Sequence, residues 1–184
     1  MRSLQNYICK CFFLFTLGIV SSSSLWSIDI ITQAQTVTAS DGTMVAVWEV
    51  DDGISSIIEG ATFDGISWSA PFQISVFGET SMGPKIQINS LGNVVVGWTV
   101  IDAVNEIIVL KAATKLLGFA FTAPLTVSTS ATAGVIDFTL FVDSVGPSGN
   151  ISAVWNSVDT TPTYKTMFSQ SPFGGAWSAP IQLR

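Results

Sequence analysis

The chain has 184 residues, of which 48% are hydrophobic and 11% are charged, so it can bury the core of one domain and is not a disordered acidic tail. Its 13 acidic and 7 basic residues give a net charge of −6, without a cluster of Lys or Arg. Because nucleic acids are bound through clustered basic side chains, this balance argues against a nucleic-acid partner.

Residues 1–27 are predicted to be a signal peptide. Arg2 and Lys10 supply its positive charge, residues 11–20 are an apolar run, and small residues follow at 21–24. The run is too short for a stable membrane span, which needs about 20 apolar residues. We expect export to the periplasm, the cell surface or the medium, with no membrane span after cleavage; an uncleaved anchor or a buried helix is the alternative.

Both cysteines, Cys9 and Cys11, lie in this segment, and the chain has no histidine. The mature protein therefore has no disulfide, no His-based triad and no zinc or copper site of the ordinary kind. We expect no cofactor, with a weak calcium site as the one possibility considered below.

The rest of the chain is built from three repeats. A strand-like stretch ending in tryptophan occurs at Gly42–Trp48, Gly92–Trp98 and Gly149–Trp155. An aromatic-Ser/Thr-Ala-Pro signature follows each copy, at Trp68–Pro71, Phe121–Pro124 and Trp177–Pro180. A period of about fifty residues with continuous strand patterning is typical of stacked sheets.

Each repeat is predicted to contain four strands bounded by turn residues. In the middle repeat we expect them at Lys85–Asn89, Asn93–Val100, Glu106–Ala113 and Phe119–Ser128, the last interrupted at Pro124. Gly92 and Asn93 tolerate the positive φ of a tight hairpin turn. Pro124 should lie in an outer strand, where its missing N–H does least harm.

The second strand of each repeat is apolar on both faces, which predicts burial between layers. The repeated Trp48, Trp98 and Trp155 would then fill the space between adjacent sheets. An aromatic platform for a ligand is the alternative. The same structural interpretation covers the aromatic residues of the second signature, which are Trp68, Phe121 and Trp177.

Four-stranded antiparallel sheets repeated at this spacing resemble blades of a β-propeller. The segment Thr62–Trp68 is similar to the Asp-box of sialidase-type propellers, although it is one residue short between Asp64 and Gly65. The predicted fold is therefore all-β, with a signal helix followed by three four-stranded blades in an open arc over residues 28–184. The blades are expected at 29–77, 78–131 and 132–184.

Three blades are too few to close a ring, since propellers have about four to eight. The outer faces of the first and last blades are expected to be apolar, so that self-association or a partner would cover them. A piece of a longer ancestral propeller and a compact non-propeller β fold are the alternatives.

A repeated acidic position is the best candidate for a binding site. Asp52, Asp102 and Asp159 each follow the repeat tryptophan by four residues, and Asp51 and Glu106 add charge nearby. Carboxylates at one end of the blades would suit a weak cation or sugar hydroxyls. The alternative is that each aspartate caps its own turn.

The resemblance implies a sialidase site with three arginines, but the mature chain has only Arg184. We therefore expect a non-catalytic exported module that binds carbohydrate or protein. A glycosidase-like enzyme using two carboxylates is one alternative, and a remnant without independent function is another.

Overall fold

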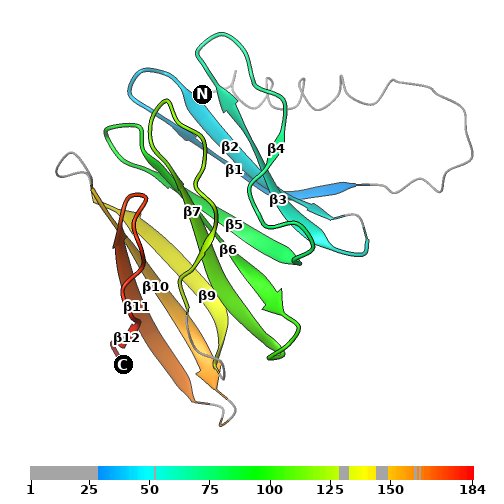
Figure 1. Ribbon diagram of the computed structural model, residues 1–184, viewed down its shortest axis with the longest axis vertical. Helices are drawn as coiled ribbons and strands as arrows, with labels where there is room; N and C mark the ends of the chain where they lie inside the picture. Colours follow the sequence, from blue (N-terminus) through cyan, green and yellow to red (C-terminus); the bar gives the residue numbers. More distant parts are fainter. Residues whose placement is uncertain (1–28, 52, 129–132, 144–148, 160, 162) are drawn as a thin grey trace, which may run out of the picture.

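The computed structural model is all-β over the residues that it describes, which are 29–51, 53–128, 133–143, 149–159, 161 and 163–184. Strands in these residues form three antiparallel sheets of four, and Figure 1 shows the sheets side by side in chain order. The predicted fold class, an open row of three four-stranded sheets, is confirmed. The predicted signal peptide and Asp52 lie outside the described residues.

Each sheet is a simple meander in which consecutive strands are neighbours. The first sheet contains β1 (Ile30–Thr38), β2 (Met44–Asp51), β3 (Ser56–Phe63) and β4 (Phe72–Gln73). The second contains β5 (Ser81–Ile88), β6 (Val94–Asp102), β7 (Ile107–Lys115) and β8 (Leu125–Thr126). The third contains β9 (Ala133–Val142), β10 (Asn150–Asp159), β11 (Tyr164–Pro172) and β12 (Ile181–Gln182).

The fourth strand of each sheet is much shorter than the sequence indicated. Instead of a strand over Phe119–Ser128, the second sheet has only two residues in β8, with an isolated bridge between Lys115 and Phe121 before it. Pro124 lies immediately before β8, at the outermost position. Its missing N–H explains why the ladder does not run continuously from Phe121 into β8.

A glycine with positive φ precedes the second strand in each sheet. Gly42, Gly92 and Gly149 all have positive φ, at 86°, 80° and 50°. Asn93 does not, contrary to the sequence expectation. The Asn93 carbonyl accepts a hydrogen bond from the Asn89 N–H, so Asn93 is already paired across the hairpin. Its side-chain Oδ1 accepts from the Leu117 N–H at 3.0 Å.

The repeated tryptophans occupy one structural position. They pair with the third strand as Trp48 with Glu59, Trp98 with Lys111 and Trp155 with Met167. Trp98 is fully buried in a cluster that joins the first and second sheets, and Trp155 is buried in a cluster that joins the second and third. Trp48 is buried too, but belongs to neither cluster.

The middle strand β6 contributes to both clusters, as its continuous apolar sequence predicts. Val96 and Trp98 face the first sheet, while Val95 faces the third. Gly97 lies on the same face as Val95, where an added Cβ would be only 3.0 Å from Leu140 Cδ1. The small residue therefore allows close approach of the two sheets.

The second signature has a hydrogen-bonding role in every sheet. Its hydroxyl accepts from a backbone N–H of the third strand, through the pairs Ser69 with Thr62, Thr122 with Thr114 and Ser178 with Gln170. The aromatic residue before it is partly buried: Trp68 lies 5.4 Å from the Phe63 ring, while Phe121 and Trp177 pack against the two clusters. In every sheet the signature therefore anchors the short outer segment to the third strand by the same hydrogen bond.

The outer face of the third sheet carries both apolar and polar side chains. Val154, Phe168 and Ile181 form one apolar row across it, and Ile181 is exposed. One neighbouring row is polar, with Asn156 and Thr166, and the other combines Ser152 and Gln170 with Phe141, which is 54% exposed. The equivalent rows of the second sheet carry Val95, Thr114, Thr99 and Leu110.

Candidate functional site

The acidic residues predicted from the sequence lie at one end of the three sheets. Strands β2, β6 and β10 finish at this end with Asp51, Asp102 and Asp159, and the turns that follow are on the lower side of Figure 1. We call it the Asp-turn end. The segment Val76–Thr80, which leads into β5, reaches the same end because β5 runs antiparallel to β6.

Each of the three aspartates holds its own turn. Asp51 Oδ1 accepts from the Gly53 N–H at 2.8 Å. Asp102 Oδ1 accepts from the Val104 and Asn105 N–H groups, and its Oδ2 accepts from Asn105 Nδ2. Turn capping is therefore an observed role of these residues, and any ligand would meet carboxylates that are fixed in position.

Asp159 is the most strongly perturbed of these carboxylates. Its Oδ2 accepts from Lys165 Nζ at 2.9 Å, and its Oδ1 accepts from the Thr161 N–H and hydroxyl. These bonds, with that from Lys165 the largest cause, lower the pKa of Asp159 to about 2. The bond from Asn105 is the largest cause of the lowered pKa of Asp102. Both groups are anions at neutral pH and serve as acceptors rather than proton donors.

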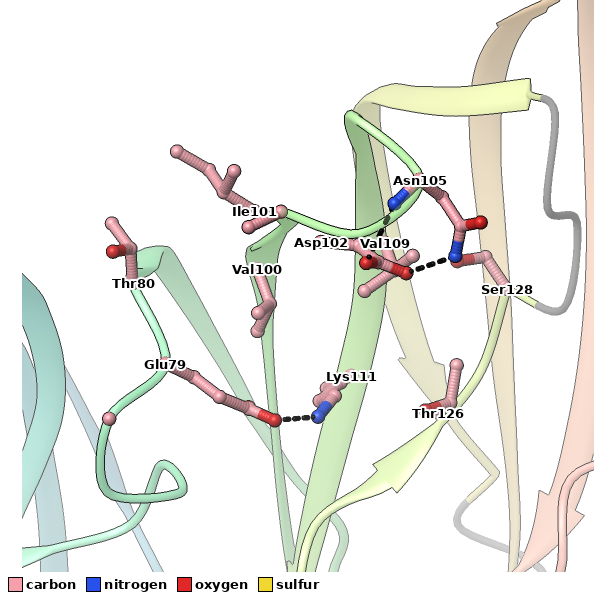
Figure 2. Close-up of a pocket in the computed structure, with 12 residues that line it drawn as sticks. Glu79, Thr80, Val100, Ile101, Asp102, Asn105, Val109, Lys111, Thr126 and Ser128 are labelled. Atoms are coloured by element: carbon pink, nitrogen blue, oxygen red, sulfur yellow. Dashed lines mark hydrogen bonds and ion pairs between the residues drawn. The ribbon is translucent and has the colours of Figure 1, made fainter.

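An open pocket of about 610 Å³ lies on the second sheet at this end. Figure 2 shows the ion pair of Glu79 with Lys111 on one side of it, at 2.5 Å, and Asp102 with Asn105 on the other. The lining also includes hydroxyls and aliphatic side chains, of Thr80, Thr126, Ser128, Val100, Ile101 and Val109. The pocket thus combines charged, hydroxyl and apolar groups.

A second hollow, of about 450 Å³, lies where the second and third sheets meet. Its walls are mainly apolar, formed by Ile107, Ile108, Val135, Ile136 and Val158, with Gly134 between them. Two of the predicted residues, Glu106 and Asp159, also line it. It is therefore a mainly apolar cleft that two acidic residues also line.

The structure divides the predicted site residues between different places. Asp102 lines the pocket on the second sheet, Glu106 and Asp159 line the hollow between the sheets, and Asp51 lines neither. Within the described part of the chain, no group of three or more acidic residues is placed to hold a metal ion. Sequence reasoning missed Glu79 and Lys111, because a pair 32 residues apart follows no repeat or motif.

Exposed apolar side chains also gather at the Asp-turn end. Ile54 and Val104, at the first two turns, are 92% and 91% exposed, and Tyr164, the first residue of β11 after the third turn, is 74% exposed. Phe77, in the segment that leads into β5, is 90% exposed. Solvent-facing apolar side chains that recur at equivalent turns are typical of an interaction surface rather than of random surface composition.

Over the described residues, the structure contains no helix with the length and apolar character needed to cross a membrane. Comparison with known protein families finds no family model that matches the chain, and no curated protein is significantly similar to it.

Proposed function

We propose that this chain is an exported, non-catalytic binding module, and that the Asp-turn end binds a protein partner. The observation that carries the proposal is the exposure of Ile54 and Val104 at the same position of the first two turns, together with that of Tyr164 at the start of β11, just after the third turn. Turns capped by aspartate present these side chains in defined positions, which lowers the entropy cost of binding. The predicted signal peptide supports an extracytoplasmic location.

The electrostatics of the site favour binding over catalysis. A carboxyl group that acts as a general acid needs a raised pKa. The pKa values of Asp102 and Asp159 are lowered instead, by bonds within their own turns. The ammonium group of Lys165 lies 2.9 Å from Asp159 Oδ2, and its positive charge disfavours a cation at that turn.

The test is a selection of binders from a phage-displayed peptide library on the purified protein, followed by affinity measurements on variants. The double variant Ile54→Ser/Val104→Ser should weaken the selected peptides about tenfold or more, since apolar anchors dominate interface energies. The matched control is Ile66→Ser, because Ile66 is 91% exposed but lies between β3 and β4, at the opposite end. Selected peptides that respond equally to both changes, or to neither, would refute the proposal.

A carbohydrate ligand is the second candidate, and the pocket on the second sheet favours it. Sugars present hydroxyls and apolar C–H faces, which match the hydroxyl, amide and aliphatic groups around Asp102. A glycan array compared between the wild type and Thr80→Val tests this candidate. Loss of a specific signal in the variant supports it, and an array without any signal rejects it.

A further inference from the structure

We propose that the hollow between the second and third sheets receives a basic side chain, arginine or lysine, from the protein partner. This inference rests on the proposed function, because the partner is the one that docks at the Asp-turn end. It adds a second binding site, distinct from the exposed turn residues and from the pocket on the second sheet.

The shape and lining of the hollow fit an amphipathic cation. At about 450 Å³ it falls within the size range of small-molecule pockets, so it has room for a side chain but not for a folded element. Its apolar walls, which include Ile107, Val135 and Val158, suit the aliphatic stem of such a residue. The carboxylate of Glu106 would meet the charged head.

Glu106 is the residue best placed to make the ion pair. Within the part of the chain that the structure describes, its carboxylate has no hydrogen bond or ion pair, whereas both oxygens of Asp159 are engaged by Thr161 and Lys165. Asp159 and Lys165 neutralise each other, which leaves Glu106 as the net charge at the hollow. A cation from a partner would therefore add to the site without displacing an existing bond.

The net charge of the chain favours the same occupant. At −6, with acidic residues at each turn of this end, the surface attracts basic partners over a distance of about a Debye length. A neutral apolar side chain would leave Glu106 unpaired beside it, and an acidic one would be repelled.

The experiment uses two blocked tripeptides as probes, Gly-Arg-Gly and Gly-citrulline-Gly, titrated into the ¹⁵N-labelled protein and followed by backbone amide NMR shifts. Citrulline keeps the shape of arginine without its charge. The expected result is that the arginine peptide shifts amides around the hollow, such as those of Glu106, Gly134 and Ile136, while the citrulline peptide does not. Glu106→Gln should weaken the arginine peptide about two- to fivefold, the range expected of an exposed ion pair.

The matched control is Glu59→Gln, which removes an equal charge from β3 of the first sheet and should leave the titration unchanged. Equal shifts with citrulline, shifts spread over the acidic residues of the whole protein, or no effect of Glu106→Gln would each overturn the proposal. Ile54→Ser/Val104→Ser should not alter the arginine response. A response that persists while the library selection fails would therefore refute the docking surface and retain the basic-residue site.

Discussion

Asp51, Asp102 and Asp159 each end a strand and hold the turn that follows it. The hydrogen bonds are local, reaching two or three residues along the chain, and so they could be anticipated from the position of aspartate before a turn. The ion pair between Asp159 and Lys165 could not, because it depends on how β10 and β11 face each other.

The lowered pKa of Asp159 predicts a specific acid sensitivity. Its folded pKa of about 2 lies below the ordinary value of 3.8, so the stabilisation is complete above about pH 4 and is lost as the pH falls toward 2. In Asp159→Asn the free energy of unfolding should change less steeply across this interval. The measurement is urea unfolding at a series of pH values.

Lys165→Met should flatten the same interval, because it removes the first cause of the lowered pKa. Identical pH profiles for the wild type and both variants would contradict the assignment.

The inner hairpin of each sheet carries a feature that the sequence did not indicate. The strand pairing has a β-bulge opposite the repeat tryptophan in the first two sheets, facing Trp48 and Trp98, and in the third sheet the register shifts between Asn156 and Ser157. The bulges increase the twist of the inner strands β1, β5 and β9 where adjacent sheets meet. In β5 the bulge contains Gly83 with a φ of 65°, and in β1 the equivalent residue is Gln33 with a φ of 51°.

Gln33→Gly should stabilise the protein by roughly 0.5 kcal/mol. A left-handed conformation costs a non-glycine residue about 1 kcal/mol or more, and the greater flexibility of glycine in the unfolded chain offsets part of the gain. Thermal and urea unfolding measure the difference. Gln35→Gly, two residues later in β1 where φ is negative, should destabilise instead, so a loss of stability in both variants would contradict the explanation.

The three sheets share one plan but differ in what covers them. The second sheet is buried on both faces, by the clusters that contain Trp98 and Trp155. The outer face of the third sheet replaces the buried Leu110 with Thr166 at the equivalent position. Polar residues on this face lower the free energy that would be gained by packing another sheet against it, as in the terminal repeats of stacked proteins.

This difference predicts unequal costs for equivalent substitutions. Leu110→Ala should destabilise the protein by about 2–5 kcal/mol, because it leaves a cavity in the cluster between the second and third sheets. Thr166→Ala should cost less than about 1 kcal/mol, the loss of one exposed hydrogen bond. Comparable costs in urea unfolding would mean that the outer face of the third sheet is covered in solution.

Repeats, hairpins and strand patterning determined the number of sheets, the order of their strands and the burial of β6, because all of these follow from local periodicity. The tertiary structure alone decided that Glu79 pairs with Lys111 and that Glu106 and Asp159 line one hollow. Those contacts join residues that are far apart in the chain, through loops and between neighbouring sheets. Their distances depend on twist, bulges and side-chain packing, which a local pattern does not specify.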